Sequence, residues 1–276
     1  MSDIFNGSSL NSELFANLVT QAQFAAYEQS IARQLVTVFD APANSGKVLQ
    51  VPVWSSVSAD LITDESVSVR KGTNTTSATI TLAEHVVYHQ VTDMLRDSSY
   101  SDVFAQLGDQ SGRAIAESID TQVFSHFNSL SGNVTAVASL TVGDIFDRVA
   151  LLRANKLTGP FYCVVHPGAA VKLKKALTAT TSYQNATAVA EGVLGGFYIG
   201  TIAGCQIFES ALVPVAEGVA AGAVFTVGAL GHAMRGGIDM NTLYLPASRA
   251  TDVVLKATAG AAVLQAGFGI VLNTTI

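Results

Sequence analysis

The hydrophobic positions between Ser98 and Leu130 recur every four residues, which is the spacing of a helix face. As one helix this stretch, which contains no proline, would be roughly 48 Å long at 1.5 Å per residue. Each step of four turns about 400°, so the apolar stripe moves ~40° around the helix at every step. We therefore predict a long spine helix that changes packing partners along its length. Its apolar positions are Val103, Leu107, Ile115, Ile119, Val123 and Phe127.

The segment before the spine helix has the pattern of strands. Residues 47–54 (KVLQVPVW) are strand-like, residues 67–82 are rich in valine and threonine, and residues 85–91 (HVVYHQV) alternate. Together they predict a long antiparallel ribbon over residues 47–92. The ribbon contains few large apolar residues, and a two-stranded ribbon is marginally stable alone. We expect it to lie on another subunit.

Residues after the spine helix predict an α/β segment. Thr141 and Asp144 have the spacing of a capping box at the start of a helix. A strand is predicted over residues 161–166 (FYCVVH), and Pro167 is predicted to be the first residue of the next helix. Further strands are expected in TIAGCQIFES (201–210) and GAVFTVGALG (222–231).

Both ends of the chain also carry predictions. An amphipathic helix is expected from Leu10 onward, followed by an extended stretch over residues 34–40. At the C-terminus, a turn at Ala259–Gly260 would join the last two strands in a hairpin.

The composition favours a chain whose surface is covered. Charged residues are 13% of the total, against about 25% in typical soluble domains. Hydrophobic residues are 49% and the mean hydropathy is +0.38. The apolar run over residues 219–231 is shorter than the ~20 residues of a membrane-spanning helix, and residues 1–30 do not resemble a signal peptide. We predict a cytosolic chain that is covered by neighbouring subunits rather than by lipid.

Candidate chemistry is sparse. ANSGK (43–47) lacks the first glycine of a phosphate-binding loop. His85 and His89 would stand roughly 13 Å apart along a strand, too far for one metal ion, so hydrogen-bonded or solvated histidines are expected. Cys163 and Cys205 read as small buried hydrophobes. We predict no catalytic, cofactor-binding or metal site.

Two groups of charges have alternative interpretations. Those of the ribbon are either solvated turn charges or contacts to a neighbouring subunit. Those on the two helices of the α/β segment form a solvated face or attract nucleic acid weakly. The net charge of −6 argues against a dedicated DNA-recognition module. The ribbon group is Asp60, Asp64, Glu65, Arg70 and Lys71, and the helix group is Arg148, Arg153, Lys156, Lys172, Lys174 and Lys175.

The order of these parts resembles a known family. The resemblance is carried by DAPANSGKVLQVPVW with ITDES, by the run from Val91 to Phe124, by FYCVVHPGAAVKLKKAL, and by IAGCQIFESALVP with GAVFTVGALGHAM. In this order they resemble the major capsid proteins of tailed phages, which have the Hong Kong 97-type fold. The resemblance covers most of the chain from about residue 30 onward.

The resemblance implies an α+β fold in five segments. These would be an N-terminal arm (1–46), an extended E-loop (47–92), the spine helix of the P domain (93–131), an A domain (132–232) and the returning strands of the P domain (233–276). Such a subunit is not an enzyme and has no cofactor. It assembles in the host cytoplasm into the hexamers and pentamers of an icosahedral virion shell around double-stranded DNA.

The resemblance also implies partners and leaves alternatives open. Besides other copies of itself, the subunit would contact a portal and scaffold or decoration proteins. It would bind packaged DNA non-specifically and would not bind a membrane. One alternative is an encapsulin, the same fold used as a cellular nanocompartment shell. Another is an α/β hydrolase or binding protein with long β-insertions.

Two glycines lie on one face inside the spine helix. Gly108 and Gly112 each cost ~1 kcal/mol relative to alanine at an interior helical position. One interpretation is close packing against another backbone. The other is a bend point that lets the spine straighten as a shell matures.

Overall fold

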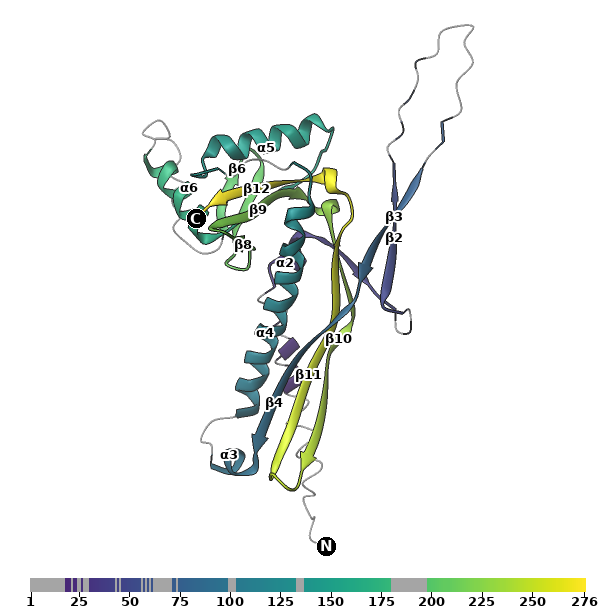
Figure 1. Ribbon diagram of the computed structural model, residues 1–276, viewed down its shortest axis with the longest axis vertical. Helices are drawn as coiled ribbons and strands as arrows, with labels where there is room; N and C mark the ends of the chain where they lie inside the picture. Colours follow the sequence, from purple (N-terminus) through teal and green to yellow (C-terminus); the bar gives the residue numbers. More distant parts are fainter. Residues whose placement is uncertain are drawn as a thin grey trace.

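The computed structural model has an elongated body with a lobe at one end and a ribbon that projects on the side away from the lobe (Figure 1). The residues that it describes are 18–20, 22, 23, 26, 30–42, 44, 46–55, 57, 59, 61, 71, 72, 74–98, 103–132, 137–179 and 198–276.

The body is a four-stranded sheet with strand order β1-β10-β11-β4. β10 and β11 form its long antiparallel hairpin, paired from Leu230 opposite Val263 to Leu245 opposite Ala250. β1 runs parallel to β10 at one edge, and β4 is antiparallel to β11 at the other. The strands are β1 (Thr37–Asp40), β4 (Ala83–Thr92), β10 (Leu230–Leu245) and β11 (Ala250–Val263).

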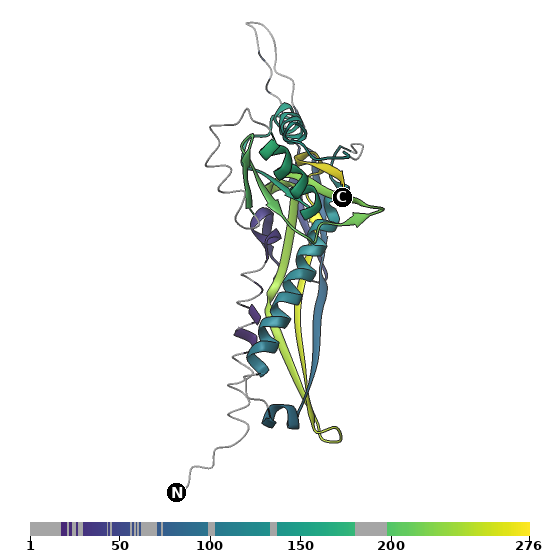
Figure 2. The same cartoon turned by 90° about the vertical axis from the view of Figure 1, so that its left-hand side faces the viewer.

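The spine helix is α4 (Val103–Ser125), which lies along the long strands (Figure 2). It continues as a 3₁₀ turn, η1 (His126–Ser129), and ends where Leu130 becomes extended. The predicted helix is confirmed, but its predicted start at Ser98 is wrong, because Ser98 is the last residue of a separate short helix, α3 (Asp93–Ser98).

The drifting apolar stripe does change partners. Ile115 and Ile119 pack in a core with Val253 and Leu255 of the long sheet. Further along, Val123, Phe124 and Phe127 pack with residues of a second sheet, among them Phe225 and Val164, and the Phe127 and Phe225 ring centroids are 5.5 Å apart. One helix thus connects two cores, as its pattern predicted.

The second sheet has strand order β12-β9-β5-β7-β6, with β8 paired to β9. Helices α5 and α6 pack on one face of it through Ile145, Leu152 and Leu173. The end of α4 packs on the other face. The elements are α5 (Val142–Ala154), β5 (Phe161–Val165), α6 (Pro167–Ala179), β6 (Tyr198–Ile202), β7 (Cys205–Glu209), β8 (Val215–Ala216), β9 (Val219–Thr226) and β12 (Gly269–Thr275).

Local signals in this lobe are confirmed. The hydroxyl of Thr141 accepts from the Asp144 backbone N–H at 3.3 Å, and the Asp144 carboxylate accepts from the Thr141 N–H at 2.8 Å. This is the predicted capping box, and α6 begins at Pro167 as predicted. These signals depend on residues within four positions of each other.

The predicted C-terminal hairpin is wrong. Ala259–Gly260 lies inside the continuous strand β11, and β12 leaves the body to pair with β9 in the lobe. A Cβ at Gly260 would overlap the carbonyl oxygen of Thr81, so glycine permits a close backbone approach there rather than a turn. The real hairpin turn is at residues 246–249, between β10 and β11.

The predicted ribbon is also shorter than expected. β2 (Val48–Trp54) and β3 (Thr75–Thr81) form its two strands. The alternating stretch over residues 85–91 belongs to β4, which pairs with β11. Upstream, the stretch predicted as extended begins with a short helix, α2 (Ala32–Leu35), before β1. The helix predicted from Leu10 lies largely outside the described residues.

Candidate interaction surfaces

The ribbon presents one face that the rest of its own chain leaves exposed. In β2 the exposed and half-buried positions alternate, and Leu49 and Val51 pack against a small core that contains Ile80 and Leu82. We call the opposite side the outer ribbon face. It consists of Val48, Gln50, Pro52 and Trp54 on β2 with Thr75, Ser77, Thr79 and Thr81 on β3.

Large apolar side chains continue outward from the ribbon. Trp54 is 65% exposed, Val57 56% and Leu61 97%. A two-stranded ribbon orders its residues at an entropic cost that its few internal contacts offset poorly. Exposed apolar groups on such an element are typical of a surface that binds another protein.

The predicted contact charges of the ribbon stay predictions. Asp60, Asp64, Glu65 and Arg70 lie outside the described residues. Lys71 is described, and its side chain is exposed.

The two spine glycines are both buried. A Cβ at Gly112 would overlap the backbone of Ala22, which belongs to the N-terminal segment packed on α4. Close packing is therefore a sufficient reason for glycine at this position. Gly108 lies one turn earlier on the same helix, and the bend hypothesis for the pair stays a prediction.

His85 and His89 join β4 to the spine helix. Nδ1 of His85 lies 2.7 Å from Ser118 Oγ, and its Nε2 lies 3.2 Å from Gln122 Oε1. Nε2 of His89 lies 2.9 Å from Ser111 Oγ. The prediction of hydrogen-bonded histidines is confirmed, but they lie between the sheet and α4 and not in the ribbon.

Several of the basic residues on α5 and α6 have structural partners. Arg153 donates to the Ala203 carbonyl at 3.2 Å, and Lys172 donates to the Thr275 carbonyl at 2.8 Å. Lys174 pairs with Glu209 at 2.9 Å. Arg148 is only 9% exposed, so the interpretation of a wholly solvated basic face is wrong at that position.

Asp120 is a buried acid in α4 that the sequence interpretation missed. It is 2% exposed, and its carboxylate accepts from Ser30 and from two backbone N–H groups of the N-terminal arm. Burial raises the pKa of this carboxyl, and the hydrogen bonds from Ser30, Ala32 and Ile31 oppose that rise. The sequence does contain a signal for this buried acid, because Asp120 directly follows Ile119, which belongs to the apolar stripe of the spine helix.

The described part of the chain holds little that suggests catalysis. Among its residues, no three His, Cys, Asp or Glu side chains are grouped as metal ligands. Cys163 and Cys205 are buried and not joined in a disulfide, as predicted. A hydrogen bond with Cys205, together with burial, raises the pKa of the Cys163 thiol, which disfavours the reactive thiolate. No helix of the described residues is long and apolar enough to cross a membrane.

Comparison with known proteins identifies the fold. The structure of the cyanophage P-SCSP1u capsid matches with a TM-score of 0.67 at 19% identity, covering 87% of this chain and 86% of that chain. The match to Mycobacterium phage Che8 has a TM-score of 0.66 at 18% identity, covering 83% of this chain and 85% of that chain. A virus-like particle from Pyrococcus furiosus matches with a TM-score of 0.61 at 15% identity, covering 94% of this chain and 98% of that chain.

The sequence itself gives the family. No curated protein matches the sequence significantly. The family model for phage capsid proteins matches residues 74–271, which is well over half of the chain. The matched range includes α4, the long strands β4, β10 and β11, the second sheet from β5 to β9, and the start of β12. The chain therefore belongs to the phage capsid protein family and has the Hong Kong 97-type fold.

Proposed function

We propose that this protein is the major capsid subunit of a tailed phage, which assembles into hexamers and pentamers of an icosahedral shell around double-stranded DNA. The proposal assigns it a structural role with no catalytic activity. Assembly takes place in the host cytoplasm, and the product is the virion capsid.

The observation that carries the proposal is the outer ribbon face. A two-stranded element that projects from the body, with Trp54 65% exposed on it, gains stability when a second molecule covers it. The low charge of the chain has the same explanation, because a surface buried between subunits needs few charges for solubility. A heterologous contact of this kind, repeated around an axis, closes into rings.

The parts of the fold have assignments under this proposal. The ribbon is the E-loop, and the long sheet with α3 and α4 is the P domain. The second sheet with α5 and α6 is the A domain. β12 pairs with β9, so we place the last strand in the A domain rather than in a P-domain segment over residues 233–276.

The proposed partners follow from the same role. Copies of the chain are the main partner, and a portal, a scaffold or decoration proteins are the others. The ribbon charges from Asp60 to Lys71 would contact a neighbouring subunit. Contact with packaged DNA would be non-specific and weakened by salt.

The direct test is electron microscopy and sedimentation of the expressed full-length chain, alone and with its scaffold if the genome encodes one. Closed shells of uniform diameter are the expected result. A chain that stays monomeric at high concentration under every salt and scaffold condition would contradict the proposal.

The encapsulin alternative makes a different prediction about contents. The family model favours a phage capsid protein, because it is the phage family that matches residues 74–271. Particles purified from infected cells should contain nuclease-protected double-stranded DNA. Particles that contain a cargo enzyme and no DNA would instead support a nanocompartment.

A further inference from the structure

Asp120 connects two parts of the chain that are 90 residues apart. One carboxylate oxygen, Oδ1, accepts a hydrogen bond from Ser30 Oγ at 2.7 Å. The other, Oδ2, accepts from the backbone N–H of Ile31 at 2.9 Å and of Ala32 at 3.3 Å. We call Ser30, Ile31 and Ala32 the arm junction.

The arm junction has no side-chain cap of its own. α2 begins at Ala32, the last residue of the junction, and the N-cap residue Ile31 makes no side-chain hydrogen bond to the first turn. A helix start leaves backbone N–H groups unpaired, and a side-chain oxygen of Ser, Thr, Asp or Asn is the usual acceptor. Here Asp120 of α4 supplies that partner from another helix. The N-terminal side of α2 is thereby hydrogen-bonded to the spine.

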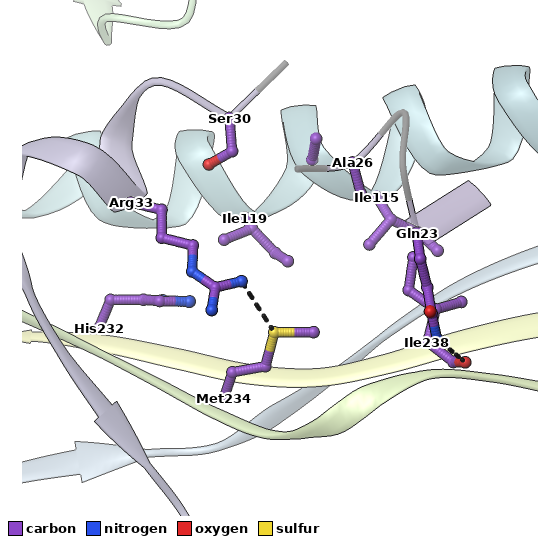
Figure 3. Close-up of a pocket in the computed structure, with 10 residues that line it drawn as sticks. Gln23, Ala26, Ser30, Arg33, Ile115, Ile119, His232, Met234 and Ile238 are labelled. Carbon is purple, nitrogen blue, oxygen red and sulfur yellow. Dashed lines mark hydrogen bonds between the residues drawn. The ribbon is translucent and has the colours of Figure 1, made fainter. Parts of the chain in front are cut away.

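A small cavity lies beside this contact (Figure 3). Its volume is about 30 Å³, room for about one water molecule, and Ser30, Arg33, Ile119 and His232 are among the residues that line it. The guanidinium of Arg33 reaches Met234 Sδ at 4.0 Å. His232 is 1% exposed, and its Nδ1 has no hydrogen-bond partner among the described residues. The joint between arm and spine therefore contains polar groups among apolar ones and is not fully packed.

We propose that the Asp120 carboxyl is a latch that holds the N-terminal arm on the spine helix, and that gain of its negative charge loosens the latch. Two of the three hydrogen bonds come from the backbone, so a side-chain change in the arm does not remove them. The latch fixes how the arm enters β1, the edge strand of the long sheet.

The sign of the charge effect follows from burial. Desolvation is the largest influence on the Asp120 carboxyl, and it raises its pKa above the ordinary value of 3.8. A raised pKa in the docked arm means that docking favours the protonated form. Docking is therefore strongest at acidic pH and weakens as pH rises through the pKa of Asp120. A neutral carboxyl still makes the contact, because one oxygen can accept from the backbone while the O–H donates to Ser30.

Other charged groups near the latch would act differently. Arg33 follows the arm junction, His232 lies on β10, and His85 lies on β4. The residues of β11 that pack in the adjoining cores, such as Ala257 and Ala261, are apolar. The pKa of His232 is lowered from 6.5 to about 4, so this group lowers stability as pH falls from 6.5 toward 4, which is opposite in sign to the effect of Asp120.

The test is amide hydrogen exchange of the full-length chain, measured over residues 30–35 and corrected for the intrinsic pH dependence of exchange. In the Asp120→Ala variant, exchange at Ile31 and Ala32 should rise by at least about tenfold at every pH, because both amides lose their acceptor. In the Asp120→Asn variant the side-chain oxygen still accepts from the backbone and the amide donates to Ser30. Protection should remain, and the loss of protection with rising pH that Asp120 causes should disappear.

Two further variants keep the test decisive. Glu117→Gln removes a carboxylate from an exposed position of the same helix and should change neither the level of protection nor its pH dependence. If Asp120→Ala does not fold, Ser30→Ala removes one bond of the latch and should raise exchange several-fold. Wild-type protection in Asp120→Ala, or in Ser30→Ala, would refute the latch. Exchange in Asp120→Asn as fast as in Asp120→Ala, or with the wild-type pH dependence, would refute the role of charge. These results concern the isolated chain and do not depend on whether it forms a shell.

Discussion

At Gly112 the spine helix and the N-terminal segment are in backbone contact. A Cβ there would overlap the carbonyl of Ala22, and backbone atoms cannot move aside as a flexible side chain can. Gly112→Ala should therefore destabilise the folded chain by about 1–3 kcal/mol despite the better helix propensity of alanine. Chemical denaturation of the purified chain measures this change.

Gly143 offers a matched control. It lies exposed in the first turn of α5, where an added Cβ would meet only Thr141 Oγ1 at 3.6 Å. Gly143→Ala should be neutral or slightly stabilising. Equal effects at Gly143 and Gly112 would contradict the close-packing interpretation. Because Gly112→Ala changes packing as well as helix stiffness, this variant alone does not test a bend during maturation.

His232 makes stability depend on pH. Its pKa is lowered from 6.5 to about 4 by burial and by the neighbouring charge of Arg33. The unfolded chain then binds more protons than the folded chain between these two values, so stability falls as pH falls from 6.5 toward 4. At about 1.36 kcal/mol per pH unit the loss is up to about 3 kcal/mol.

The His232→Gln variant isolates this effect. The difference in unfolding free energy between pH 7 and pH 4.5 should be smaller in His232→Gln than in the wild type. His126→Gln, at the first residue of η1, should keep the wild-type difference. Wild-type pH dependence in His232→Gln would show that other groups are responsible.

At the scale of elements, a substitution on the outer ribbon face should affect assembly without affecting the folding of the single chain. Trp54→Glu places a charge on the outer ribbon face, where the side chain is 65% exposed in the isolated chain. Its unfolding midpoint should stay close to that of the unassembled wild type, because surface changes usually alter stability by less than about 0.5 kcal/mol.

Assembly of the same variant should fail, because a charge buried in a contact without a partner is strongly unfavourable. Trp54→Phe keeps an aromatic side chain and should still assemble. Sedimentation of the two variants at equal protein concentration distinguishes assembled shells from free subunits. Normal shells from Trp54→Glu would show that this face does not carry the contact.

At the scale of the whole molecule, low charge and an uncovered ribbon couple stability to assembly. Binding to copies of itself stabilises the folded chain by mass action. The thermal unfolding midpoint of assembled wild-type shells should exceed that of Trp54→Glu subunits at the same concentration. Calorimetry of both samples checks this, and equal midpoints would mean that the contacts add no stability.

The sequence by itself determined the features that depend on neighbouring residues. The spacing of apolar residues in α4 predicted both a long helix and its change of partners, and Thr141 with Asp144 predicted the start of α5. Pro167 predicted the start of α6. Each of these signals lies within a few positions of the element that it defines, so no knowledge of distant residues was needed. The order of such segments also indicated the family.

Only the tertiary structure decided which strands pair and which polar groups meet. An alternating pattern marks a strand but does not say which edge it joins. The pattern over residues 85–91 therefore predicts a ribbon strand, although β4 pairs with β11. The C-terminal pattern likewise predicts a hairpin of the last two strands, although β12 pairs with β9. The contact between Asp120 and Ser30 likewise depends on the packing of the arm on α4, because the two residues are distant in the sequence and become neighbours only when the chain folds.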